Sequence, residues 1–367
     1  MKITVLMENT AFRPDLVCEH GLSLYIEACG KKILFDAGQT GAFADNAEKL
    51  GVDLTAVDFA VLSHGHYDHG GGLLRFLERN QTAPIYLRRE AFGPHYNGTD
   101  KYIGLDPALS DCGRLVFTED GMTLGEGLTL RSGGVPHHPL NSFGLKYRGQ
   151  EGFLPDDFRH EQYLIIEENG SRICISGCSH RGILNIVRWF RPDVLIGGFH
   201  FVKLTDPAAL TAAARELLDS PAKYYTGHCT GTEQFAFLKA LMGEDLEPIS
   251  TGLTIELEKT AVHQHGGPLL YDGFQNSEGD ADHGQGHQQE QSSREQHTAD
   301  QHGDGDGEQH GGGDLRHTPG TADSQPQSLE KQPAEYNYND QIQHNGSLPF
   351  LVTVSIAEPC REIVEEL

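Results

Sequence analysis

The stretch S-H-G-H-Y-D-H-G-G-G-L, residues 63–73, constrains this chain more than any other part of its sequence. It places three histidines and one aspartate within six positions, after the apolar run 57–63 and before the helical pattern of residues 70–79. Such a run is typical of a buried strand. Side chains that follow it lie at the carboxyl edge of a sheet, where open α/β folds bind their ligands. Clustered imidazoles and carboxylates are good metal donors, so we expect a metal site at this edge.

The order of strand, polar turn and helix recurs along the chain. Three further strand-like segments also end at a histidine, at positions 180, 200 and 228. If these strand ends and the strand before His64 share one edge, the four histidines converge. The alternation predicts a layered α/β architecture with sheets inside and helices outside. The expected strands are 2–6, 22–28, 32–38, 57–63, 83–87, 114–117, 128–132, 193–200, 223–231 and 249–257, with a hairpin in 162–180 and helices at 42–51, 70–79, 181–190, 207–218 and 233–243.

The composition divides the chain into three parts. Residues 1–260 have the apolar runs and glycine punctuation of a globular domain. Residues 261–345 form an acidic, low-complexity extension rich in Asp, Gln, Gly and His, and we expect 266–345 to be disordered. Residues 261–367 hold 19 acidic and 4 basic residues, which accounts for -15 of the total charge of -25. A segment this polar buries too little surface to offset its ordering entropy.

The ends of the chain leave two questions open. The nine histidines after residue 260 could bind zinc, nickel or copper loosely, or they could belong to a solvating extension. Residues 346–367 regain a strand-then-helix pattern, and the sequence assigns them no role.

The acidic balance bears on partners and compartment. A nucleic-acid backbone attracts basic patches, so we expect no nucleic-acid partner. The sequence contains no apolar run long enough to span a bilayer, and its first residues resemble a strand rather than a signal peptide. The seven cysteines have no disulfide-framework spacing, which favours a reducing cytoplasm. We expect a cytoplasmic protein that acts on a small molecule; the sequence indicates no oligomeric state.

The H-x-H-x-D-H motif of residues 64–69 resembles the signature of the metallo-β-lactamase fold superfamily, and Asp36 in L-F-D-A-G matches another of its motifs. Several stretches within residues 1–258 are similar to one branch of it, the 7,8-dihydropterin-6-yl-methyl-4-(β-D-ribofuranosyl)aminobenzene 5′-phosphate synthase type. These are E-H-G-L-S-L-Y-I-E, I-L-F-D-A-G-Q-T, S-G-C-S-H-R-G-I-L-N-I, I-G-G-F-H and G-H-C-T-G. The resemblance implies an αββα sandwich with two metal ions at the sheet edge, and a link to methanopterin-type cofactor synthesis.

The resemblance also implies a set of metal ligands. Carried over by position, His64 and His66 bind the first ion, while Asp68, His69 and His228 bind the second. We expect two zinc ions, with iron or manganese as alternatives. Two metals can bridge a water molecule, lower its pKa and hold an attacked phosphoryl or carbonyl group.

The chain departs from the superfamily pattern in two places. Cys178 stands where a bridging aspartate is usual, and a thiolate there can bind zinc. The usual third histidine of the first site is also missing. His180 is the preferred substitute, followed by His160 and then by His137 or His138.

The remaining candidates complete the functional prediction. Asp36 is expected to orient the ligating histidines rather than bind metal. Asp68 and His200 are the candidate catalytic residues, and His200 could touch substrate or metal. The sequence therefore predicts a metal-dependent hydrolase or transferase acting on a small phosphorylated or ester substrate. The alternative is a non-catalytic metal-handling or sensor protein that uses the fold and the His-rich extension.

Overall fold

The computed structural model describes residues 1–257. The predicted acidic extension (261–345) and the segment 346–367 lie outside the described residues. The boundary proposed at residue 260 therefore remains a prediction.

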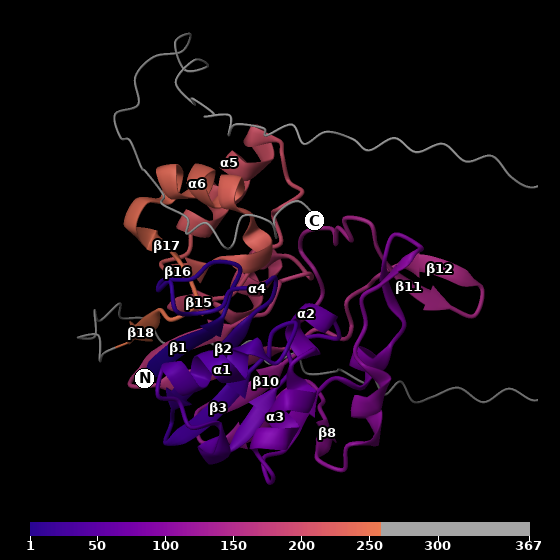
Figure 1. Cartoon of the computed structure of the whole chain (residues 1–367). Helices are drawn as coiled ribbons and strands as arrows, with labels where there is room; N and C mark the ends of the chain where they lie inside the picture. The colour runs from indigo at the N-terminus through magenta and orange to yellow at the C-terminus, as the bar shows by residue number, and fades with distance from the viewer. Residues whose placement is uncertain (258–367) are drawn as a thin grey trace, which may run out of the picture. The chain divides into compact units, whose positions relative to one another are not determined.

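Two seven-stranded sheets form the centre of the described part (Figure 1). The first sheet has the order β18 (Thr254–Glu256), β1 (Lys2–Met7), β2 (Ser23–Ala28), β3 (Lys31–Phe35), β4 (Phe59–Val61), β5 (Ile85–Leu87) and β8 (Leu115–Phe117). The second has the order β17 (Leu246–Pro248), β16 (Lys223–Thr226), β15 (Val194–Ile196), β14 (Ser171–Ile175), β13 (Tyr163–Glu168), β10 (Leu128–Arg131) and β9 (Met122–Gly125). A third sheet contains β12 (Gly152–Pro155), β11 (Leu145–Gly149), β6 (His95–Asn97) and β7 (Lys101–Tyr102).

Helices cover the outer faces of the two large sheets (Figure 1). The α-helices are α1 (Ala42–Lys49), α2 (Tyr67–Gly70), α3 (Leu73–Arg79), α4 (Ile183–Phe190), α5 (Pro207–Leu218) and α6 (Thr232–Met242). The 3-10 helices are η1 (Leu54–Ala56), η2 (Arg89–Phe92), η3 (Pro107–Asp111), η4 (His228–Thr230) and η5 (Gly243–Asp245). The longest of these helices, α5, has 12 residues, so within residues 1–257 none has the length and apolarity to cross a bilayer.

Three hydrophobic layers follow from the alternation of side chains along the strands. In β3, Ile33 and Phe35 face the space between the two sheets, whereas Leu34 faces the α1 and α3 side. In β13, Leu164 faces the same inter-sheet core, and Tyr163 packs on the α4–α6 side. Successive residues of a strand point to opposite faces, so each sheet is apolar on both faces and is covered on both. The αββα sandwich expected from the sequence is confirmed.

Turn chemistry fixes the two central hairpins. The β2–β3 turn uses Cys29 and Gly30, and the β13–β14 turn uses Asn169 and Gly170, each with positive φ. Two successive positive φ angles define the type I′ turn, whose twist matches that of the paired strands. The hairpin predicted in 162–180 is present, and the predicted strands 22–28 and 32–38 pair as the other hairpin.

Two differences from the predicted elements bear on the site. The helix expected over 70–79 is two helices, and α2 already contains Asp68 and His69 because the chain enters the helix after the extended residue His66. The third sheet lies in the region 88–160, where the sequence indicated only two strands. Its strands have two to five residues, too few to give a clear alternating pattern.

Candidate metal centre

The predicted histidines meet at the carboxyl ends of the central strands. His64 follows β4, and His180, His200 and His228 follow β14, β15 and β16, which are parallel neighbours. Nε2 of His64 lies 3.2 Å from Nε2 of His180, and the rings of His180 and His200 are 4.3 Å apart. The convergence expected from the strand ends is therefore present.

The first group of donor atoms joins Asp68, His69, Cys178 and His228, all buried. Nε2 of His69 lies 3.1 Å from both the Cys178 sulfur and Nε2 of His228. An Asp68 carboxylate oxygen lies 3.3 Å from Nε2 of His228 and 3.2 Å from Nε2 of His20. The donor atoms of this group therefore come from three parts of the chain and point at one small volume. These parts are the segment from β4 into α2 and the segments that follow β14 and β16.

The second group joins His64, Cys178 and His180. Cys178 belongs to both groups, as expected for a residue in the position of a bridging ligand. His180, the preferred substitute for the missing third histidine, is placed directly opposite His64.

Neighbouring acceptors fix the protons of these imidazoles. Asp36 Oδ2 lies 2.7 Å from Nδ1 of His69, and a carboxylate only accepts, so this nitrogen donates, and in the neutral ring Nε2 has the lone pair. The Ser63 hydroxyl donates to Asp36 at 2.7 Å and therefore accepts from Nδ1 of His64 at 2.8 Å. Asp36 thus lies where the sequence placed it, orienting two histidines.

His228 is oriented in the same way. Its Nδ1 lies 2.9 Å from Oδ1 of Asn9, an atom that also accepts the N–H of Gly21. That second bond identifies the Asn9 atom as the carbonyl oxygen, so Nδ1 of His228 carries the proton. Its Nε2 lone pair therefore faces the Nε2 lone pair of His69.

These donors fit a transition-metal ion. Facing lone pairs repel each other unless a cation lies between them. Nitrogens bound to a tetrahedral zinc ion at about 2.0–2.1 Å lie about 3.3 Å apart, close to the 3.1–3.2 Å separations here. Burial lowers the pKa of His64, His66 and His180 well below the usual range, which keeps these rings in the neutral form that binds metal.

Strained backbone gathers around the same point. Asp36, Ser179, His200 and His228 all have φ between 49° and 59°, in the left-handed region that non-glycine residues rarely adopt. Such conformations typically cost about 1–3 kcal/mol each and concentrate at functional sites. The strain therefore marks the same edge as the donor atoms.

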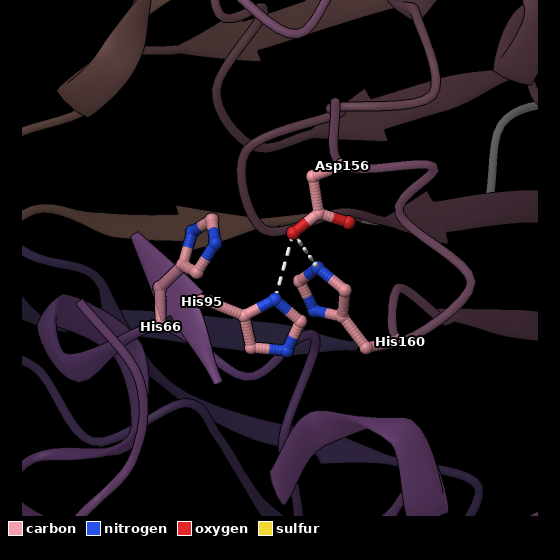
Figure 2. Close-up of side chains that lie close together, drawn as sticks. All are labelled: His66, His95, Asp156 and His160. Atoms are coloured by element: carbon pink, nitrogen blue, oxygen red, sulfur yellow. Dashed lines mark hydrogen bonds and ion pairs between the residues drawn. The ribbon is translucent and has the colours of Figure 1, made fainter. Parts of the chain in front are cut away.

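His66 lies beside both His64 and a further group of polar side chains. Its ring is 4.6 Å from that of His64, but its donor atom groups with His95, Asp156 and His160 (Figure 2). The expected pairing of His64 and His66 on one ion thus remains a prediction. His160, the second choice for the missing ligand, also lies in this other group.

The remaining candidates are His137, His138 and His200. The backbone N–H groups of His137 and His138 both donate to Asn185, and Nε2 of His138 lies 2.7 Å from Glu216. Neither histidine joins a donor group within residues 1–257. His200 groups with Cys178 and Cys229, and its partly exposed ring packs against Phe143.

Sequence reasoning missed several residues at this edge. Cys229 directly follows His228, so its position next to a ligand candidate was an available signal. His20 lies in the stretch E-H-G-L-S-L-Y-I-E and is not among the predicted ligands, although its ring nitrogen lies 3.2 Å from Asp68. His95 and Asp156 had no such signal, because they are 61 residues apart and stand alone in the poorly patterned region.

Comparison with known proteins identifies the fold family. The family model of the metallo-beta-lactamase superfamily matches residues 16–228. A 7,8-dihydropterin-6-methyl-4-(beta-D-ribofuranosyl)-aminobenzene-5'-phosphate synthase of Methanocaldococcus jannaschii is 27% identical over 287 residues, covering 70% of this chain and 96% of the relative. An uncharacterized protein of the same organism is 31% identical over 216 residues, covering 56% and 81% of the two chains.

A solved structure supports the same assignment. Tm1679, a metal-dependent hydrolase of the beta-lactamase superfamily, has a TM-score of 0.62 and 27% sequence identity. The similarity covers 70% of this chain and 99% of Tm1679. This chain belongs to the metallo-beta-lactamase superfamily.

Proposed function

We propose that the protein is a metal-dependent hydrolase or transferase with a dinuclear zinc centre, acting on a small phosphorylated or ester substrate. The observation that carries the proposal is the set of imidazole lone pairs and one thiol directed at a common volume. A superfamily whose named relatives include metal-dependent hydrolases supports the same reading.

We assign the ligands from the two donor groups. His64, His180 and Cys178 would hold one ion, with His66 as the further ligand that the sequence predicts, and Asp68, His69, His228 and Cys178 would hold the other. Cys178 would bind both as a thiolate in the place of a bridging carboxylate. When bound, zinc supplies Lewis acidity toward a phosphoryl or carbonyl oxygen and lowers the pKa of water.

The surrounding side chains would position the reactants. Asp68 is the candidate catalytic carboxylate, and its contacts with His20 and His228 hold it on the edge of the site. We assign His200 to substrate contact because its ring is partly exposed beside the donors and its buried Nδ1 has no hydrogen-bond partner within residues 1–257.

The synthase relative suggests the narrower reading. The match covers 96% of that relative, and the relative's name includes an aminobenzene ribofuranosyl phosphate. We propose a substrate of this class, either an aminobenzoate joined to a ribose phosphate or a pterin. We expect aminobenzoate riboside phosphate or a dihydropterin to raise the melting temperature of the protein. If neither compound changes the melting temperature, this narrower proposal is wrong.

Chelation and metal add-back test the broader proposal. Full-length protein would be assayed on phosphodiester, lactone and thioester panels as purified, after chelation, and after addition of Zn²⁺, Fe²⁺ or Mn²⁺. We expect activity that chelation abolishes and one metal restores. Activity that never depends on metal would overturn the proposal.

The metal-handling alternative makes a different prediction. Elemental analysis of the full chain and of a variant lacking residues 266–345 would measure how much metal the extension holds. Loss of most bound metal on deletion, together with an inactive core, would favour metal handling over catalysis.

A further inference from the structure

Two buried glutamates lie behind the turns that carry candidate metal ligands. Glu8 directly follows β1, and Glu161 lies two residues before β13; they are 2% and 0% exposed. Each accepts the backbone N–H of one candidate ligand, Glu8 that of His228 and Glu161 that of His180. Building on the metal centre assigned above, we propose that Glu8 and Glu161 are positioning residues, which hold these two histidines in the orientation that binds metal.

Glu161 binds the turn after β14 with both carboxylate oxygens. Oε1 accepts the backbone N–H of His180 at 2.7 Å, and Oε2 accepts that of Arg181 at 2.9 Å. The Tyr163 hydroxyl also donates to Oε2, at 2.5 Å. The two bound N–H groups belong to the peptide groups on either side of the His180 Cα atom. One carboxylate therefore fixes the backbone from which the His180 ring projects.

Glu8 binds the turn after β16 in a similar way. Oε1 accepts the backbone N–H of His228 at 2.5 Å, while Oε2 accepts the backbone N–H and the hydroxyl of Thr10, each at 2.7 Å. The next residue, Asn9, accepts from Nδ1 of the His228 ring at 2.9 Å. Two successive residues after β1 thus hold both the backbone and the ring of a histidine that follows a strand of the second sheet.

The backbone of both turns needs such contacts. His228 has a φ of 49°, and Ser179, directly before His180, has a φ of 59°. Residues other than glycine are strained in this region, and the strain persists only where surrounding contacts fix the conformation. Each glutamate binds the N–H of the strained residue or of the residue that follows it. The glutamates therefore stabilise the conformations that direct the two imidazoles toward the donor groups.

Gly227 shows how closely Glu8 approaches the second turn. A Cβ at this position would lie 2.7 Å from Oε1 of Glu8 and 2.8 Å from the side chain of Ile249, so it would displace the carboxylate. Burial of a carboxylate is unfavourable unless donors surround it, and backbone or hydroxyl donors reach both oxygens of Glu8 and of Glu161. The sequence thus provides both the buried acceptor and the space for it.

Double-variant cycles in the full-length protein test the two assignments. A positioning residue acts through its histidine, so Glu161→Gln should lower the zinc affinity of the parent but not that of His180→Ala. Glu8→Gln should behave in the same way toward His228→Ala. In each glutamine an NH₂ group replaces one acceptor oxygen and cannot accept a backbone N–H.

Competition with a chromogenic chelator would measure the zinc affinity of each protein. We expect each single glutamine variant to bind zinc about 10–100-fold more weakly than the parent, as loss of an orienting partner does. Once the histidine is replaced, the same substitution should have little further effect, because the two residues act together. The histidines of residues 261–367 are present in every variant, so they do not alter the comparison.

Glu167→Gln is the matched control, because Glu167 lies in β13 and its exposed carboxylate pairs with Arg172. It should keep the zinc affinity of the parent. Circular dichroism would show which variants fold. Hydrogen exchange of the metal-free parent protein needs no variant: the amides of His180 and His228 should be protected, because their acceptors are the glutamates rather than a metal ion.

Three results would overturn the proposal. These are parent-level affinity in a folded glutamine variant, an equal loss of affinity with and without the histidine, and rapid exchange of the two amides in the metal-free protein. Each cycle decides the role of its own glutamate, and all three results leave the proposed metal centre intact. A parent protein that binds no zinc would instead overturn the metal centre, and the positioning role with it.

Discussion

Asp36, which follows strand β3 of the first sheet, contacts the ring of His69, one of the candidate metal ligands. Oδ2 of Asp36 lies 2.7 Å from Nδ1 of His69, while Oδ1 accepts the backbone N–H of Ser63 at 2.7 Å. Both side chains are fully buried. One carboxylate therefore fixes the ring of His69 and the backbone that leads into His64.

Asp36→Asn should weaken metal binding without unfolding the protein. The amide keeps the shape of the side chain but removes the ionised acceptor that holds His69 with its lone pair inward. Loss of such an orienting partner typically costs about 10–100-fold in metal affinity. Competition with a chromogenic chelator would measure the metal affinity of each variant. Asp58→Asn, which removes a partly exposed carboxylate on the same sheet, should leave the affinity unchanged, and equal affinities for the two variants would contradict the assigned role of Asp36.

Cys178→Ser tests whether one thiol serves both donor groups. A hydroxyl is a poorer zinc ligand than a thiolate, so we expect at least one tightly bound ion to be lost per chain. Cys174→Ser is the control, because Cys174 is equally buried but packs in the core on the α4–α6 side. It should lower stability while keeping the metal. A Cys178→Ser protein with unchanged metal content and affinity would exclude the thiol as a ligand.

Gly65 should not tolerate a side chain. A Cβ at this position would lie 2.2 Å from the carbonyl oxygen of Ala91, a backbone atom that cannot rotate away. We expect Gly65→Ala to lower the free energy of unfolding by about 1–3 kcal/mol, as overpacking does. Gly113→Ala, whose Cβ would meet nothing within 4 Å, should change it by less than about 0.5 kcal/mol. Urea unfolding of the two variants would show whether the loop between His64 and His66 has the predicted close contact.

Asn80 joins α3 to the segment before β4. Its buried amide donates to the carbonyls of Leu54 and Val57 at 3.0 Å and accepts the N–H of Ala83 at 2.7 Å. Asn80→Ala would leave these groups unpaired, and each costs about 1–3 kcal/mol, so we expect a loss of at least about 3 kcal/mol. Denaturant unfolding checks the value. Asn141→Ala, at an exposed position, is the control. Equal free energies of unfolding for the two alanine variants would show that the hydrogen bonds of Asn80 do not stabilise the fold.

The sequence allowed prediction of those features whose signals are local. The H-x-H-x-D-H turn follows one apolar run within a few residues, and Asn169-Gly170 is itself the hairpin signal, so both were predictable. The contact between His95 and Asp156 was not. It depends on β6, β11 and β12 pairing in the third sheet, and strands this short have no period that separates them from loops.

The assignment of His66 shows a second limit. Motif spacing places His64 and His66 side by side, but it does not show which nitrogens are already committed to other partners. That information comes from the amide of Gly65 and the carbonyl of Glu90, which contact the rings of His160 and His95 and whose roles are fixed by their chemistry, and from Ser63, whose hydroxyl already donates to Asp36. Hydrogen-bond partners therefore show which ring nitrogens are free to bind a metal, and motif spacing alone does not.

The donor groups draw on both ends of the described chain. His64, Asp68 and His69 come from the first sheet, whereas Cys178 and His228 follow strands of the second, more than a hundred residues later. During synthesis the amino-terminal half would leave the ribosome with only part of a coordination shell. With the proposed ligand set, tight metal capture would wait until His228 has emerged and the two sheets have closed on each other. Metal loading would accordingly act as a late step that locks the finished sandwich, rather than as a nucleus from which it folds.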